Sequence, residues 1–208
     1  QALLKSSNIK PAKYACVVKS GLSADIGIMD FCRNYKTIDF ICIATRGAGK
    51  LDKLLGTTTG NLTTQSPVPV ITVPKNYRAN PVKRILYATD FRNYAEELKK
   101  VIAFARPLGA KVKVLYLSRP NEVVPAGKTM KAQLAGVSYR NIEVEIEESR
   151  AGQSLPANLQ KQIDRLKPSL IVMFTDQGRS FFQKITSPSN TEKVSFVTKT
   201  PLLSFRKD

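Results

Sequence analysis

One segment of this sequence combines the residue types that proteins use to hold phosphate groups. It reads ATRGAGKLDKLLGTTTGN from residue 44. Gly47 and Gly49 permit tight turns and a close approach of the backbone to a ligand. Gly56, Thr57 and Thr58 then open an expected helix, whose unpaired N–H groups and neighbouring hydroxyls favour an anion. The segment therefore predicts a phosphate site, with a purely structural role for the glycines as the alternative.

The same segment does not have the ending of a Walker loop. Lys50 is followed by Leu51, where that motif requires Ser or Thr. Lys50 and Lys53 nevertheless add positive charge beside the glycines. The segment is therefore not a Walker loop, although it retains the features of an anion site.

The segment belongs to a unit that occurs twice in the chain. Gly21 and Gly47 are 26 positions apart, as are Gly152 and Gly178, and the offset between the two pairs is 131. A Pro-led apolar strand follows each pair, SPVPVITV in the first copy and TKTPLLSF in the second. A period this long indicates duplicated domains rather than a short solenoid repeat.

Strands alternating with helices surround these glycines, which predicts a parallel sheet covered on both faces. Such sheets bind ligands beyond the carboxyl ends of their strands, where the strand order reverses. We expect strands at 14–18, 39–44, 68–73, 85–90, 112–117, 142–148, 170–174 and 202–205. We expect helices at 24–36, 57–65, 94–108 and 154–166.

Two domains are expected, at 1–76 and 77–208, joined by the linker PKNYRANP at 74–81. Nothing in the first copy matches the strand–helix–strand portion that begins the second at VKRILYATDF. Projecting the repeat backwards places roughly 50 further residues before Gln1. The alternative is that another chain supplies the missing strands.

Set in this repeat, the Gly-rich segment resembles the nucleotide-binding signature of the universal stress protein family. That signature is Gly, two residues, Gly, nine residues, Gly, and then Ser or Thr. Its positions fall here on Ala44, Gly47, Gly56 and Thr57, with eight residues between the last two glycines. The Pro-Val-x-Val strand of the family is matched at 67–70. The resemblance extends over essentially the whole chain.

The resemblance implies an α/β fold of two tandem Rossmann-like domains of the adenine nucleotide alpha hydrolase-like type. Each would be a five-stranded parallel sheet flanked by helices, with the first domain incomplete here. It also implies ATP or another adenine nucleotide as cofactor, with Mg²⁺ as an optional companion. A cytoplasmic location is expected from the cysteines, which are typical of structural thiols in a reducing compartment. Strands 68–73 and 202–205 would pair the domains into an intramolecular pseudo-dimer, and a homodimer or an unknown protein partner would be further possibilities.

The second copy departs from the signature at its phosphate half. Thr175 and Ser187 replace glycines, Gly178 is retained, and Pro188 stands at the hydroxyl position. Proline removes an N–H that a phosphate would use. This copy therefore predicts a weakened phosphate site.

The other half of the second site is present at the end of its first strand. Ala88, Thr89 and Asp90 resemble the family's strand end, where an Asp borders the adenosine pocket. The alternative role of Asp90 is a carboxylate that interacts with the dipole of the following helix. The full set of expected nucleotide contacts is Ile43, Ala44, Gly47, Gly56, Thr57, Thr58, Ala88, Thr89, Asp90 and Gly178.

Composition limits the remaining functions. The chain has 33 Lys and Arg against 16 Asp and Glu, a net charge of +17, spread over its length. A polyanion partner is one interpretation of this charge, but no recognition helix, aromatic-rich strand or zinc module accompanies it, so nucleic acid is not the expected ligand. No apolar run reaches the roughly 18 to 20 residues of a membrane helix.

Catalysis is not expected from these residues. The chain has no histidine, and no Ser or Cys stands beside a base. Its three cysteines, Cys16, Cys32 and Cys42, lie in apolar stretches without metal-ligand spacing, so we expect buried structural thiols and no metal. Three functions remain open: a nucleotide-binding regulatory protein, an interaction module of the same fold without nucleotide, and a polyanion binder.

Overall fold

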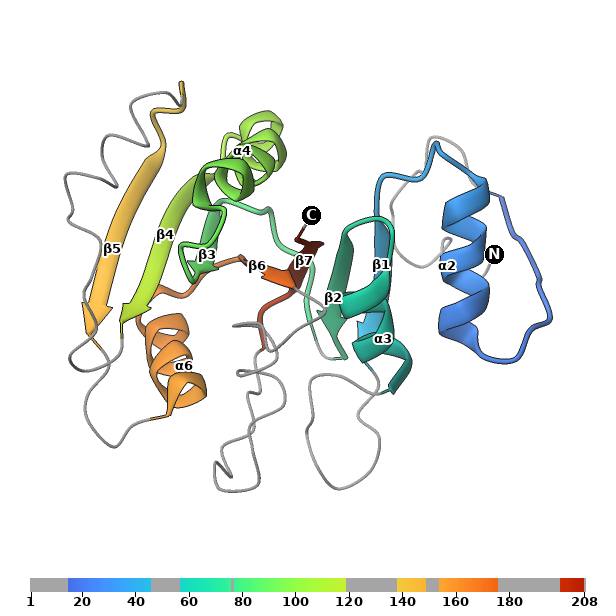
Figure 1. Cartoon of the computed structure of the whole chain (residues 1–208). Helices are drawn as coiled ribbons and strands as arrows, with labels where there is room; N and C mark the ends of the chain where they lie inside the picture. Colours follow the sequence, from blue (N-terminus) through green and yellow to red (C-terminus); the bar gives the residue numbers. More distant parts are fainter. Residues whose placement is uncertain are drawn as a thin grey trace.

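The computed structural model describes residues 15–45, 57–75, 77–118, 138–148, 154–175 and 199–207. Within them the chain forms one sheet of seven strands in the order β1-β2-β7-β6-β3-β4-β5 (Figure 1). The strands are β1 (Ile41–Thr45), β2 (Val70–Pro74), β3 (Arg84–Thr89), β4 (Lys111–Ser118), β5 (Ile142–Glu148), β6 (Leu170–Thr175) and β7 (Leu202–Arg206). The helices are α2 (Ala24–Asn34), α3 (Thr57–Gln65), α4 (Tyr94–Ala105), the 3-10 turn η1 (Arg106–Leu108) and α6 (Leu155–Leu166).

The strands fall into two sets that meet at one antiparallel junction. The second set, β5-β4-β3-β6-β7, is parallel throughout. The first set consists of β1 and β2, which are parallel to each other. At the junction β2 runs antiparallel to β7, with Val70 opposite Ser204 and Thr72 opposite Leu202. The expected adjacency of segments 68–73 and 202–205 is therefore present, within a single continuous sheet.

Buried hydroxyl groups add cross-strand hydrogen bonds at this junction. Thr72 Oγ1 donates to the Leu202 carbonyl at 3.3 Å, and Ser204 Oγ donates to the Val70 carbonyl at 3.2 Å. Both side chains are only 2% exposed. Ser and Thr fit here because each buried hydroxyl finds an acceptor on the facing strand, which removes the penalty of an unpaired polar group.

The second set is covered on both faces because its strands are apolar on both sides. One face packs on α4 through a cluster that includes Tyr87, Leu98 and Phe174. The other face packs on α6 through a cluster that includes Leu86, Leu159 and Met173. Figure 1 shows α4 and α6 on opposite sides of the sheet. This sandwiching of near-continuous apolar strands is typical of parallel sheets.

In the first set, α2 and α3 pack on the same face of β1 and β2. Met29, Leu62 and Val70 belong to the small core cluster that they share. The sequence of α3, TTTGNLTTQ, has weak intrinsic helix propensity. Tertiary contacts support it, because Leu62 is fully buried and Asn61 Nδ2 donates to Asp25 Oδ2 of α2 at 2.6 Å.

The strand expected at 14–18 is wrong for the part that the structure describes. Residues 15–20 have no regular secondary structure and are exposed. In the second copy, the matching strand β5 pairs with β4, and β4 in turn pairs with β3. Among the described residues, the first copy contains no strands that match β3 and β4. A strand at 14–18 therefore lacks a neighbour that could satisfy its backbone groups.

The expectation of buried thiols also fails for two of the three cysteines. All three are free, Cys32 is buried in α2, and Cys16 and Cys42 are exposed. Along β1, Ile41 and Thr45 are buried whereas Cys42 and Ala44 are exposed. Alternate strand residues point to opposite faces, and none of the described helices covers the face of β1 that carries Cys42.

No helix among the described residues is long and apolar enough to cross a membrane.

Candidate functional site

The strand order reverses once in the described sheet, between β3 and β6. From β3 the chain proceeds to β4 and β5 on one side, and later to β6 and β7 on the other. In parallel sheets, ligands bind at such a reversal, beyond the carboxyl ends of the strands. Asp90 follows β3 at this position, and Thr175 ends β6 beside it. We therefore examine the side chains that surround Asp90.

The loop that carries Asp90 is held by its own side chains. Thr89 Oγ1 accepts the Phe91 N–H at 3.0 Å, and Asp90 Oδ1 accepts the Arg92 N–H at 3.1 Å. Phe91 and Asn93 have φ angles of 62° and 57°. Such left-handed conformations are uncommon for residues other than glycine, and they persist where surrounding contacts impose them. The loop is thus preorganised before any ligand arrives.

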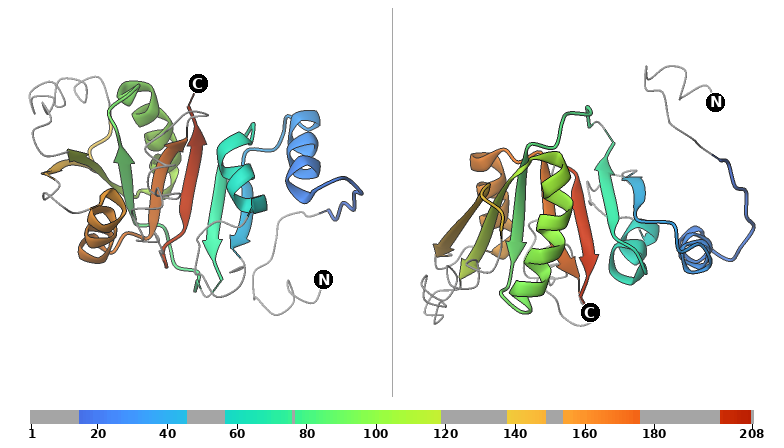
Figure 2. Two further views of the ribbon diagram at one scale, coloured as in Figure 1. Left: turned by 60° about the horizontal axis from the view of Figure 1, so that its bottom comes forward. Right: turned by 90° about the horizontal axis from the view of Figure 1, so that it is seen from above.

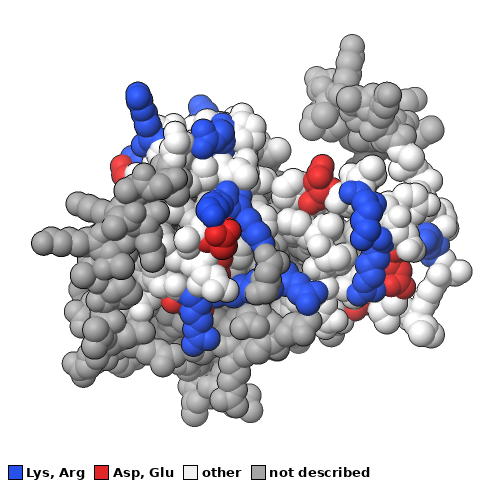
Figure 3. Space-filling view, turned by 45° about the horizontal axis from the view of Figure 1, so that its top comes forward, with Lys and Arg blue, Asp and Glu red and all other residues white. Residues whose placement is uncertain are grey.

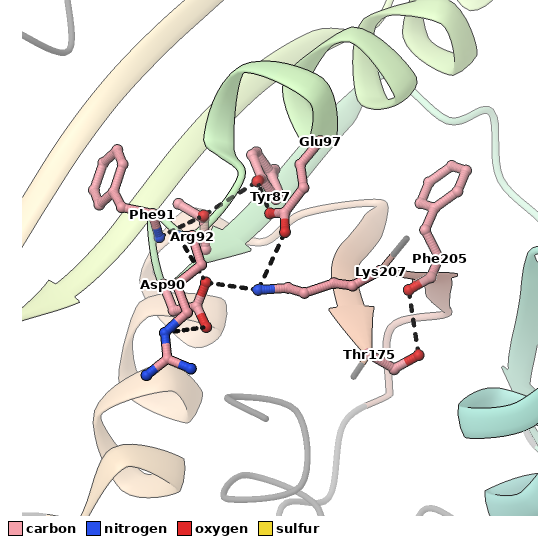
Figure 4. A network of polar contacts seen from close by, with 9 residues as sticks. Tyr87, Asp90, Phe91, Arg92, Glu97, Thr175, Phe205 and Lys207 are labelled. Atoms are coloured by element: carbon pink, nitrogen blue, oxygen red, sulfur yellow. Dashed lines mark hydrogen bonds and ion pairs between the residues drawn. The ribbon is translucent and has the colours of Figure 1, made fainter. Parts of the chain in front are cut away.

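A lysine from the other end of the sequence occupies the space beside Asp90. Lys207 Nζ lies 2.8 Å from Asp90 Oδ1 and 3.1 Å from Glu97 Oε1 of α4 (Figure 4). The side chains of Lys207, Asp90 and Glu97 are 10%, 19% and 4% exposed. The Lys207 N–H also donates to the Thr175 carbonyl at 2.7 Å, which fixes the lysine to the end of β6.

Thr175 ties this region to the first set as well. Its hydroxyl lies 3.3 Å from the Phe205 carbonyl of β7 and 3.1 Å from the Thr63 carbonyl of α3. Thr175 is fully buried. The signature position that Thr175 fills in the second copy is therefore used as a structural anchor between β6, β7 and α3.

The second carboxylate of the network, Glu97, is buried in the core. Glu97 Oε2 lies 2.5 Å from Tyr87 Oη, which lies 3.1 Å from Thr89 Oγ1. Burial raises the pKa of Glu97 above its ordinary value, while the Tyr87 hydroxyl and the Lys207 ammonium oppose this rise. Burial, and then the charge of Glu97, raise the pKa of Tyr87. Lys207 is thus the counter-ion that compensates two carboxylates in a dry environment.

Aromatic rings surround this polar network. Phe91 contacts Tyr94 and Tyr116 at ring-centre distances of 4.9 and 4.6 Å, and Tyr87 contacts Phe174 at 5.7 Å. The Tyr94 hydroxyl is buried without a hydrogen-bond partner among the described residues, and burial raises its pKa to about 12. Tyr87, Tyr94, Tyr116 and Phe174 are buried. Ion pairs in such a buried region, like that of Glu97, are stronger than ion pairs in water.

In the second copy, both carboxylate oxygens of Asp90 face groups of its own chain. Asp90 Oδ1 is shared between the Lys207 ammonium and the Arg92 N–H, and Asp90 Oδ2 lies 4.0 Å from Arg92 Nε. The interaction of Asp90 with the dipole of α4 stays a prediction beside this ion pairing. Ala88 and Thr89 are buried in β3, and Gly178 lies outside the described residues.

Sequence reasoning missed Lys207 and Glu97. Lys207 is 117 positions away from Asp90, and nothing local indicates their contact. Glu97 did leave a signal, because it lies beside Leu98 and one turn after Tyr94 on the buried side of α4. A carboxylate on the apolar face of a helix requires a partner.

In the first copy, the structure describes only the borders of the expected site. Ile43 and Ala44 lie in β1, half-buried and exposed respectively, and Thr57 is the first residue of α3. Thr58 follows it and is half-buried. Gly47 and Gly56 lie outside the described residues. Because α3 connects the parallel strands β1 and β2, its amino end lies at their carboxyl ends.

The two candidate sites lie at opposite edges of the sheet, where an edge here means the line formed by the ends of the strands. β2 and β7 are antiparallel, so the carboxyl ends of β1 and β2 are at the edge where β7, β6 and β3 begin. Figure 2 shows the linker of residues 77–83 at this edge, between the end of β2 and the start of β3. The Lys207 network is at the other edge.

The sequence matches no protein-family model and no curated protein. The fold is similar to that of solved structures. A universal stress protein from Archaeoglobus fulgidus is 20% identical with a TM-score of 0.67, over 88% of this chain and 67% of that one. A functionally unknown protein from Pseudomonas aeruginosa is 16% identical with a TM-score of 0.58, over 89% and 69%. The chain therefore has a universal stress protein fold.

Proposed function

We propose that this protein is a regulatory protein of the universal stress protein type that binds an adenine nucleotide through its first copy. Ile43 and Ala44 would border the base and ribose, with Gly47, Gly56, Thr57 and Thr58 at the phosphates. The observation that carries the proposal is the start of α3 at Thr57, between two parallel strands. N–H groups at that helix end would bind phosphate oxygens, and an accompanying Mg²⁺ would be held mainly by the phosphates.

In this proposal the chain is a tandem pair, with residues 1–76 and 77–208 as successive domains. The antiparallel β2–β7 junction supports it, because the final strands of the two copies meet there as in a pseudo-dimer. The five parallel strands of the second copy would form one complete domain. Regulation rather than catalysis is proposed, since the buried carboxylate beside Tyr87 is inaccessible to a substrate.

A second function, an interaction module that binds no nucleotide, is favoured by one observation. Lys207 neutralises Asp90 and Glu97 at the strand reversal, where a ligand would otherwise bind. If the first copy also binds no nucleotide, the continuous sheet would serve as the surface for a protein partner. The two functions differ in a single measurable property, which is stoichiometric nucleotide binding.

The test is to release small molecules from the purified protein by denaturation and identify them by mass spectrometry, followed by calorimetric titration with ATP, with and without Mg²⁺. We expect adenine nucleotide in the preparation, or binding of added ATP. Thr57→Glu should abolish binding, because a carboxylate at the helix start repels phosphate. Gln65→Glu is the control, since it adds the same charge at the exposed far end of α3.

Equal binding by the two variants would exclude the first-copy site. An empty protein that does not bind added ATP would leave the interaction module as the function. Circular dichroism spectra of both variants should match that of the parent protein, so that a loss of binding by Thr57→Glu cannot be attributed to unfolding.

A further inference from the structure

Part of the positive charge of the described residues lies at one edge of the sheet, the line formed by the ends of its strands. Nine exposed lysines and arginines lie at or beside the amino ends of β3 to β7 and the carboxyl end of β2, which share this edge. We call them the basic edge: Lys75, Arg78, Lys83, Arg84, Arg106, Lys111, Arg140, Lys167 and Lys199.

Backbone hydrogen bonds between the strand starts place part of this set in a row. The Lys111 N–H donates to the Lys83 carbonyl at 2.8 Å, and the Ser169 N–H donates to the Arg84 carbonyl at 2.8 Å. The Val112 N–H reaches the Asn141 carbonyl, next to Arg140. Consecutive strands therefore contribute a cation each. With about 4.8 Å between strands, the row over β5, β4, β3, β6 and β7 spans about 19 Å.

Few carboxylates oppose these cations among the described residues. Glu143 pairs with Lys111 at 2.5 Å, and Asp164 accepts from Gln160 on α6 one turn before Lys167. Lys83, Lys167 and Lys199 form no ion pair with any other described residue, and Arg84 donates to the Lys167 carbonyl. In the space-filling view, basic side chains also stand out over the face that is shown, with acidic ones lying against several of them (Figure 3).

We propose that the basic edge binds the phosphate backbone of nucleic acid without reading its sequence. A duplex strand carries one phosphate per about 3.4 Å of axis, so a 19 Å row faces about five to six phosphates of one strand. This matches one cation per strand of the sheet.

An anionic membrane is the less suitable partner. Surfaces that bind membranes combine basic residues with apolar groups that insert between lipids. Of the large apolar side chains that are exposed in the described residues, Leu108 is the one at the basic edge. The described residues at the edge include no stacked aromatic platform of the kind that binds single-stranded bases, which favours backbone contacts.

The test is fluorescence anisotropy of a labelled 24-base-pair DNA duplex titrated with the full chain at several salt concentrations. The edge variant is Lys83→Gln, Lys167→Gln and Lys199→Gln combined. The control variant is Lys19→Gln, Lys36→Gln and Lys161→Gln, which removes the same charge from exposed lysines elsewhere. Matching melting temperatures should show that both variants are folded.

We expect the parent protein to bind with an affinity that falls steeply with salt. The edge variant should bind at least tenfold more weakly, and its slope of log K against log salt should be shallower by about three, one per lost contact. The control variant should keep the parent slope. No binding by the parent, equal losses in both variants, or binding to vesicles with 30% phosphatidylserine but not to the duplex would each overturn the proposal.

Discussion

At the scale of single residues, Lys207 forms the ion pairs that neutralise the carboxylates of the second-copy site. Its ammonium joins Asp90 Oδ1 and Glu97 Oε1 at 2.8 and 3.1 Å, in a region that aromatic rings protect from water. A buried pair that loses one partner leaves an uncompensated charge, which costs much more than the pair contributes. The lysine is therefore a structural counter-ion, and a ligand that contacts Asp90 would compete with it.

We predict that Lys207→Met lowers the free energy of unfolding by about 3 kcal/mol, the lower end of the range for a buried pair that loses one partner. Methionine retains most of the side-chain stem, so the loss reports on the charge. Urea denaturation is the measurement. The neighbouring exposed Arg206 is the control, because Arg206→Met should change stability by less than about 0.5 kcal/mol.

The destabilisation of Lys207→Met should also grow with pH. Burial raises the pKa of Glu97, so the folded state holds a proton that the unfolded chain has lost, and stability falls as pH rises through this interval. Without the Lys207 ammonium, the pKa of Glu97 in the folded state rises further. The pH range between its unfolded-state and folded-state pKa therefore extends to higher pH. The variant should lose up to about 1.4 kcal/mol more per pH unit over the range in which its folded state holds this proton and that of the parent does not. Parallel stability curves for parent and variant would contradict this linkage.

At the scale of elements, the first copy differs from the second because its described part contains no strands that match β3 and β4. The segment of residues 15–20 has strand-like composition and is nevertheless exposed, with Val18 at 98% exposure. β-propensity describes a fit to a pleated, half-buried surface rather than a property of the backbone alone. An apolar strand pattern therefore yields no strand where no neighbouring strand is present.

We predict that Val18→Asp changes the free energy of unfolding by less than about 0.5 kcal/mol, because the side chain contacts solvent in the folded chain. The matched comparison is Val114→Asp in β4, whose side chain is fully buried. It should cost several kcal/mol or prevent folding, because an unpaired carboxylate would enter the core. Thermal or urea unfolding measures both. A large loss for Val18→Asp would mean that residues 15–20 pack in a strand after all.

At the scale of the whole molecule, one sheet joins cores of unequal size. Among the described residues, the two clusters of the second set contain fifteen and nine buried residues, whereas the cluster of the first set contains five. Local opening is easier where fewer apolar contacts hold an element. We therefore predict that amides of β1 and α3 exchange with solvent faster than those of β3, β4 and β6, measured by hydrogen exchange with mass spectrometry.

A uniform exchange rate over the sheet would contradict this prediction and would make the β2–β7 junction a strong cooperative link. The junction is short, with three paired positions between β2 and β7. A hydrogen bond from the Thr175 hydroxyl of β6 to the Thr63 carbonyl of α3 also links the two sets. Leu203→Ala is informative here, because this fully buried side chain belongs to the large cluster and its strand forms the junction. It should increase exchange in both sets.

The sequence by itself determined the alternation of strands and helices. The positions of β3, β4, β5, β6, α4 and α6 follow its apolar periodicity to within a few residues, because periodicity is local and each buried face must repeat. The internal repeat indicated α3, whose own sequence has no apolar period. The sequence also indicated the adjacency of the two final strands, which the internal repeat made visible. The Gly-rich segment of the first copy remains a sequence-based prediction, since Gly47 and Gly56 lie outside the described residues.

Only the tertiary structure decided what those elements do together. Whether Asp90 is available to a ligand depends on Lys207, which is 117 residues away, and whether residues 15–20 form a strand depends on neighbours. The gathering of lysines and arginines at one edge depends on strand order and on the antiparallel junction. Ion pairing, strand pairing and surface charge are properties of residues brought together in space, which spacing along the chain does not encode.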